Sequence, residues 1–159
     1  MKGKVAVVAG TFDHLHSGHK LMISKAFEIA DHVIIGVVRD EALAKLDKIC
    51  REGIQPYDIR VLNVVSFVDQ VILKKYPKKT YEVIGICGPY DVVLEENRKI
   101  DYIVVSDETL PRAIMINILR EKKGLNKLKI VVVPIVKDLH GRPISSHRFR
   151  TGELLWKGE

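Results

Sequence analysis

Residues 4–20 read KVAVVAGTFDHLHSGHK. This stretch changes from a strand pattern to a helix pattern at its centre, and that change indicates the class of fold. Residues 4–9 are apolar and rich in valine, as in a buried strand. Gly10 begins a turn, and apolar side chains over 18–30 then recur at the spacing of one helix face. A buried strand that passes through a glycine turn into a helix is the opening of an α/β unit.

The same alternation continues along the rest of the chain. Further strands are predicted at 32–38, 81–87, 101–106 and 128–136, and helices at 56–76, 109–123 and 146–156. Pro56 and Pro77 suit the start and the end of the long helix, and Gly124 suits a helix cap. Because repeated strand–helix crossovers require a parallel sheet, we expect one α/β domain over residues 1–159, with five parallel strands and helices on both faces.

Composition narrows the kinds of function. An apolar fraction of 47% and a charged fraction of 29% are typical of a soluble globular domain, and no apolar run is long enough to span a membrane. A strand begins almost at the N-terminus, which predicts no cleavable signal peptide and a cytoplasmic location. The two cysteines, Cys50 and Cys87, are far apart, and we interpret them as inert thiols.

The net charge of +6 suits an anionic ligand and is also compatible with weak nucleic-acid binding. The basic residues are spread along the chain, and pairs such as Lys74 and Lys75 fall on expected helix surfaces. No aromatic RNA-binding signature or zinc knuckle accompanies them. We therefore expect no nucleic acid and no membrane among the partners, and nothing in the sequence indicates an obligatory protein partner.

Phosphate-binding groups follow the first predicted strand. Ligands of parallel sheets bind beyond the carboxyl ends of the strands, where Gly10 and Thr11 offer a close approach and a hydroxyl. His16 and His19 are three residues apart at a helix N-terminus, so both can reach one phosphate. The glycine-rich fingerprints of dinucleotide sites and of P-loops are both missing from the sequence.

A second candidate site follows the last predicted strand, in the stretch ISSHRFR at 144–150. Ser145 and Ser146 offer hydroxyls and amides at a helix start, and Arg150 lies one turn after Ser146. By itself the stretch is equally compatible with a serine cap and with a phosphate site. In a parallel sheet, however, it shares an edge with the first candidate site, so that one triphosphate can span both.

These two stretches resemble the signatures of the nucleotidyltransferase superfamily. HSGH at 16–19 is similar to its [HT]-x-G-H motif and ISSHRFR to its I-S-S-T-x-x-R motif, with His147 at a position where Thr or Ser is usual. The superfamily has a Rossmann-like α/β fold, in agreement with the strand pattern. The stretches GTFDHLHSGHK, QPYDIR and IDYIVVSDET, together with Asn117, Arg120 and Gly124-Leu125, resemble the archaeal type of phosphopantetheine adenylyltransferase over nearly the whole chain.

The resemblance implies transfer of the adenylyl group of ATP to 4′-phosphopantetheine, giving dephospho-coenzyme A and pyrophosphate in coenzyme A biosynthesis. It implies that Thr11 binds the acceptor phosphate or the α-phosphate, and that His16 and His19 contact the ATP phosphates, with His19 nearest the α-phosphate. Residues 104–109 are expected to line the adenine pocket. The implied nucleotide-binding residues are Gly10, Thr11, Phe12, His16, His19, Val105, Ser106, Asp107, Arg120, Ile144, Ser145, Ser146 and Arg150.

The family also places a lysine between the two substrates. Lys45 and Lys48 are both candidates for contact with the acceptor, and the spacing to Gln55 favours Lys48 as a catalytic residue beside His16 and His19. We expect direct in-line attack by the acceptor phosphate, which is already ionised and needs no general base. No serine or cysteine is paired with a base, which excludes a covalent intermediate from this scheme. Mg²⁺ is expected to arrive with ATP, without a metal site made by the protein.

Several alternatives remain open in the sequence. His14 is predicted to be structural, because it falls outside the H-x-G-H pattern, whereas Asp13 suits turn positioning and chemistry equally well. His32 and His140 are interpreted as surface or strand-edge residues. Other candidate functions are a phospho-alcohol cytidylyltransferase, a nicotinamide-mononucleotide adenylyltransferase, and a non-catalytic nucleotide-binding module.

Overall fold

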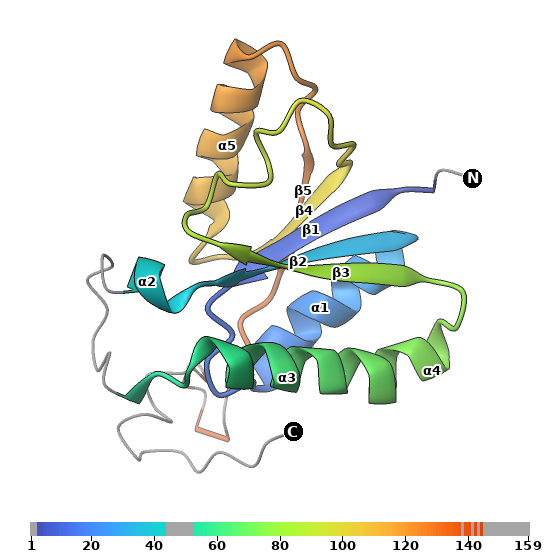
Figure 1. Cartoon of the computed structure of the whole chain (residues 1–159), viewed down its shortest axis with the longest axis vertical. Coiled ribbons are helices and arrows are strands. Elements are labelled where there is room, and N and C mark those ends of the chain that lie inside the picture. Colours follow the sequence, from blue (N-terminus) through green and yellow to red (C-terminus); the bar gives the residue numbers. More distant parts are fainter. Residues whose placement is uncertain (1–2, 44–52, 138, 141, 143, 145–159) are drawn as a thin grey trace.

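Five strands form a single parallel sheet in the computed structural model, which describes residues 3–43, 53–137, 139–140, 142 and 144 (Figure 1). The strand order is β3-β2-β1-β4-β5. The strands are β1 (Val5–Gly10), β2 (His32–Val38), β3 (Thr80–Ile86), β4 (Tyr102–Ser106) and β5 (Lys129–Val133). The predicted α/β class with a five-stranded parallel sheet is therefore confirmed.

The helices follow the predicted crossovers. They are α1 (Ser17–Ile29), α2 (Asp40–Leu43), α3 (Tyr57–Phe67), α4 (Leu73–Lys75) and α5 (Leu110–Lys122). A π-helical turn, Val68–Ile72, joins α3 to α4, so the predicted long helix is one helical run with a bulge in it. The short α2 was not predicted, because four residues carry no periodicity. The predicted helix at 146–156 lies outside the described residues.

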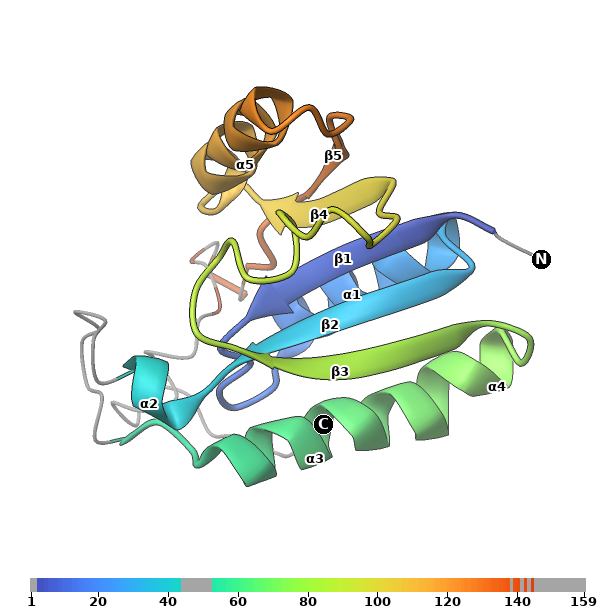
Figure 2. The same ribbon diagram turned by 45° about the horizontal axis from the view of Figure 1, so that its top comes forward.

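Helices cover both faces of the sheet. Figure 2 shows α1, α3 and α4 on one face and α5 on the other. In β2 the side chains of Val33 and Ile35 belong to the core on the first face and Ile34 to the core on the second. A strand buried on both faces reads as a continuous apolar run, which is the pattern that predicted it. Among the described residues, no helix has both the length and the apolar character needed to cross a membrane.

The middle of the sheet contains the point where the strand order reverses. The chain leaves β1 toward β2 on one side, and β4 and β5 lie on the other side. The pairing of β1 with β2 extends to Gly10, but among the described residues the pairing of β1 with β4 stops at Val7 and Ile103. The two strands thus part toward their carboxyl ends. Open α/β sheets bind their ligands in the crevice at this point.

Candidate active site

The loop from β1 to α1 has an unusual backbone at the centre of this edge. Phe12 and His14 have positive φ angles of 54° and 47°, in a region that bulky side chains rarely adopt. Phe12 is only 1% exposed, and its ring packs against that of His19 with centroids 5.3 Å apart. Such conformations persist only where the surroundings hold them, and they are concentrated at functional sites.

Two histidines begin α1 as a reciprocal cap. The Nδ1 atom of His16 accepts a hydrogen bond from the Gly18 amide at 3.0 Å, and Nδ1 of His19 accepts one from the His16 amide at 3.3 Å. This is the arrangement of a capping box, made here by two imidazoles. Because Nδ1 is an acceptor in both rings, the proton of each neutral ring sits on Nε2. The pair thus offers two Nε2–H donors at the start of a helix.

His16 stays neutral at physiological pH. Burial lowers the pKa of His16 from 6.5 to about 4, and the nearby Asp13 carboxylate opposes this only in part. A neutral imidazole donates a hydrogen bond without carrying a full charge. The ring of His16 is buried by tertiary packing, so the sequence pattern alone does not predict its lowered pKa.

Asp13 acts within the protein, on the backbone and on a neighbouring ring. It is fully buried, its Oδ1 accepts the Gln55 amide at 2.7 Å, and its Oδ2 lies 2.8 Å from Nδ1 of His14. The His14 amide in turn donates to Oε1 of Gln55 at 3.0 Å. Of the two roles left open for Asp13, these contacts favour the positioning of the turn. They also agree with a structural role for His14.

Arg60 is a residue that the sequence analysis did not single out. It lies in the first turn of α3, and its side chain is fully buried. Its NH1 donates to the carbonyls of Thr11 and Val38 at 2.8 and 2.7 Å. Its Nε donates to the Gln55 carbonyl at 2.9 Å, and its NH2 donates to Oδ1 of Asp40 at 2.9 Å. The one hint in the sequence is its place at the end of QPYDIR, four residues after Pro56.

The segment predicted to hold adenine forms the turn from β4 to α5. The Ser106 amide donates to Oγ1 of Thr109 at 3.1 Å, and the Thr109 amide donates to the Ser106 carbonyl at 3.1 Å. Val105 is buried beneath the turn, while Asp107 is exposed. The turn lies at the carboxyl edge of the sheet, as the loop after β1 does. The structure therefore brings the loop after β1 and the predicted adenine segment, 104–109, to one edge of the sheet.

Arg120 does not belong to this edge, contrary to the expectation that it binds phosphate. It lies in the last turn of α5, ten residues and about 15 Å along the helix from Leu110 at the site end. It is 4% exposed, and its NH1 and Nε donate to the carbonyls of Val93 and Asn126 at 2.6 and 2.7 Å. Burial among backbone carbonyls, which no local pattern reveals, makes it a structural residue.

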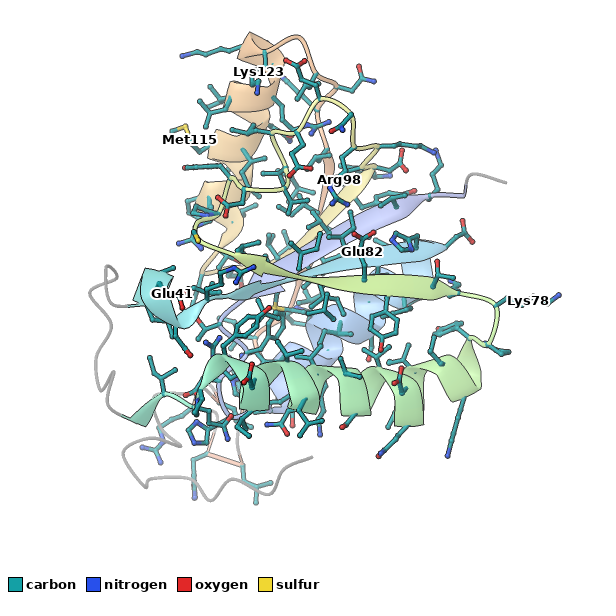
Figure 3. All side chains as sticks on the ribbon, viewed as in Figure 1. Glu41, Lys78, Glu82, Arg98, Met115 and Lys123 are labelled. Atoms are coloured by element: carbon teal, nitrogen blue, oxygen red, sulfur yellow. The ribbon has the colours of Figure 1, made fainter. Side chains whose placement is uncertain are left out.

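His32 lies at the opposite, amino edge of the sheet, in agreement with its interpretation as a strand-edge residue. Its Nε2 is 2.7 Å from Oε2 of Glu82. Oε1 of Glu82 in turn accepts from NH1 of Arg98 at 3.1 Å, and Figure 3 labels these two side chains. Its Nδ1 is 2.7 Å from Oγ1 of Thr80. His32 is therefore a natural control for changes at the two histidines of α1.

Several predicted site residues lie outside the described part of the chain. They are Lys45, Lys48, Ser145, Ser146, His147 and Arg150. Ile144, which precedes the two serines, is described, and its amide donates to the Val136 carbonyl at 2.9 Å, beyond the carboxyl end of β5. Among the described residues, no group of three or more His, Cys, Asp or Glu side chains is arranged to hold a metal ion.

The chain is similar to known proteins over most of its length. Residues 7–152 match the model of the cytidylyltransferase-like family. The chain is 44% identical over 153 residues to a phosphopantetheine adenylyltransferase of Methanosarcina acetivorans, covering 95% of this chain and 91% of that protein. It is 43% identical to the protein of that name from Methanopyrus kandleri, covering 93% and 88%. A crystal structure of a protein of unknown function from Archaeoglobus fulgidus superposes with a TM-score of 0.65 at 33% identity, covering 89% and 99%.

Proposed function

The chain belongs to the cytidylyltransferase-like family and, within it, to the phosphopantetheine adenylyltransferases, and we propose that it acts at the carboxyl edge of the sheet, where β1 and β4 part. It transfers the adenylyl group of ATP to 4′-phosphopantetheine, giving dephospho-coenzyme A and pyrophosphate. The observation that carries the assignment of the site is the capped histidine pair, whose two Nε2–H donors stand at a helix N-terminus.

The ATP phosphates bind at the start of α1. Helix amides, the positive end of the helix dipole and the Nε2–H groups of His16 and His19 all favour an anion there. Thr11, between Gly10 and the strained Phe12, offers its hydroxyl to the α-phosphate or to the acceptor. The stacking of the two rings, 3.8 Å between centroids, supports their action on one phosphate group.

The remainder of ATP extends along the same edge. The turn after β4 receives the adenine base, through Val105, Ser106 and Asp107. Ser145, Ser146 and Arg150 hold the β- and γ-phosphates, and the backbone bond of Ile144 beyond β5 supports this assignment.

The acceptor binds beside the α-phosphate, against the segment that carries Lys45 and Lys48. Two described residues on either side of that segment lie at this edge. Leu43 ends α2, directly after β2, and Gln55 is hydrogen-bonded to the loop that follows β1. We assign to Lys48 the task of neutralising charge between the two substrates.

The chemistry is a direct displacement. An oxygen of the acceptor phosphate forms a bond to the α-phosphorus while the bond from that phosphorus to the β-phosphate oxygen breaks, and pyrophosphate leaves. The protein positions the two reactants and stabilises the charge that develops on the transferring group, with His19 nearest to it. Mg²⁺, carried by the triphosphate, supplies further charge neutralisation.

The test is a product assay with matched substrates. Purified protein is incubated with Mg²⁺, ATP and 4′-phosphopantetheine, and both pyrophosphate and dephospho-coenzyme A are measured. Parallel reactions replace ATP with CTP, or the acceptor with nicotinamide mononucleotide or glycerol 3-phosphate. We expect product only from ATP with 4′-phosphopantetheine. Turnover with another pair would keep the reaction type but overturn the proposed substrates. ATP binding without pyrophosphate release would point to a non-catalytic module.

A further inference from the structure

Arg60 contacts three separate segments of the site edge from inside the protein. Its guanidinium binds the Thr11 carbonyl in the loop after β1, the Val38 carbonyl at the end of β2, and the Gln55 carbonyl before α3. Because the side chain is fully buried, it does not reach a substrate bound at this edge. Any effect of Arg60 on the reaction must therefore pass through the backbone that it holds.

Gln55 completes the connection between α3 and the loop after β1. Its amide donates to Oδ1 of Asp13 at 2.7 Å, and its Oε1 accepts the His14 amide at 3.0 Å. Arg60 holds the carbonyl of the same residue. We call Asp13, Gln55 and Arg60, joined by these bonds, the loop clamp.

The loop clamp holds the two residues of the loop whose backbone conformation is least favourable for an isolated chain. The positive φ angles belong to Phe12 and His14. Arg60 binds the carbonyl of Thr11, just before Phe12, while Gln55 binds the side chain of Asp13 and the amide of His14. Hydrogen bonds thus fall on both sides of the φ angle of Phe12 and directly before that of His14. Only two residues farther along the chain, His16 begins the cap that orients both imidazoles.

We propose that Arg60 is a positioning residue for adenylyl transfer, which keeps the loop after β1 in the shape that sets His16 and His19 against the reacting phosphate. The inference rests on the function proposed above. A displacement of about 1 Å at a reacting centre can cost about 100-fold in rate, even when the altered residue is remote from the chemistry. The planar fork of an arginine presents five donors in fixed directions, whereas a lysine offers three donors on a flexible stem.

The decisive comparison is between Arg60→Lys and Arg120→Lys. Both arginines are buried and bind backbone carbonyls, but only Arg60 binds the loop after β1. We expect both variants to melt at a lower temperature, and only Arg60→Lys to lose about 10- to 100-fold in kcat. The KM for ATP is expected to change much less than kcat. If both variants lose the same amount of melting temperature and kcat is unchanged in Arg60→Lys, Arg60 is merely structural and the inference is overturned.

A second pair of variants keeps the test decisive if Arg60→Lys does not fold. Gln55→Ala removes the acceptor of the His14 amide from a partly exposed side chain and should lower kcat in a folded protein. Adding His14→Gly should then restore part of that kcat, because glycine adopts positive φ freely. Unchanged kcat in Gln55→Ala, or no recovery with glycine, would contradict the inference. An inactive wild type would overturn the proposed function as well, whereas an active wild type with unaffected variants overturns this inference alone.

Discussion

The imidazole rings of His16 and His19 stack with their centroids 3.8 Å apart and their planes 22° from parallel. The stack is held by the backbone, because Nδ1 of each ring accepts an amide of the first turn of α1. Both tautomers are therefore set before a ligand binds. Donors that need no rearrangement during the reaction are the most effective at stabilising developing charge.

His19→Ala should remove most of the turnover while the fold remains. Loss of one preorganised donor to the transferring phosphate typically lowers kcat by about 10²–10³-fold. Dephospho-coenzyme A formation at saturating substrates measures this, with circular dichroism and thermal melting to establish the fold. His32→Gln is the matched control, because His32 lies at the other edge, bonded to Thr80 and Glu82. A folded His19→Ala variant with near wild-type turnover would refute the site.

His16 should make the stability of the protein fall on acidification. Its pKa is 6.5 in an unfolded chain and about 4 in the fold, so the unfolded state binds more protons between these values. The stabilising contribution of the neutral ring is complete above pH 6.5 and is lost as the pH falls toward 4, with a slope of at most about 1.4 kcal/mol per pH unit.

Urea titrations between pH 7 and pH 4 give this slope as a difference between wild type and His16→Asn. Asparagine is a good helix cap and can still accept the Gly18 amide, but it does not titrate. The variant should therefore lose less stability over the window. Identical pH dependence in the two proteins would show that His16 is protonated equally easily in the folded and unfolded chains.

Arg120→Met should weaken the fold and spare the reaction. The substitution leaves the carbonyls of Val93 and Asn126 without their charged donor, which costs about 2–4 kcal/mol of unfolding free energy. The KM for ATP and kcat should stay within about twofold, because the side chain is buried far from the site end of α5. A large rise in KM with little loss of stability would restore Arg120 as a phosphate ligand.

Removal of Mg²⁺ should stop turnover without changing the unliganded protein. We expect the ion to enter with ATP, bound mostly by the triphosphate. A chelator should then abolish pyrophosphate release, and readdition of Mg²⁺ should restore it. The melting temperature of the protein without nucleotide should be the same with and without chelator. A chelator-dependent fall in that temperature would indicate a metal bound by the protein itself.

Local sequence patterns were sufficient to predict β1 and α1 and to bring His16 and His19 together. The apolar run before Gly10 and the helical spacing after it predicted β1 and α1, since side-chain periodicity depends on neighbours within about four residues. The contacts between His16 and His19 also span a single helical turn. A motif read along the chain was therefore enough to place both rings together.

The roles of Arg60 and Arg120 were decided by tertiary structure alone. Arg60 bonds to Thr11 across 49 positions, and Gln55 bonds to Asp13 across 42. Arg120 matched a family pattern, yet its guanidinium is buried and donates to backbone carbonyls, including that of Val93, 27 positions away. The sequence by itself determined the five strands, the longer helices among the described residues and the place of the histidine pair at a helix start, because local spacing encodes them. Which arginines are buried, and which loop each one holds, follows only when the sheet brings distant backbone groups together and removes them from water.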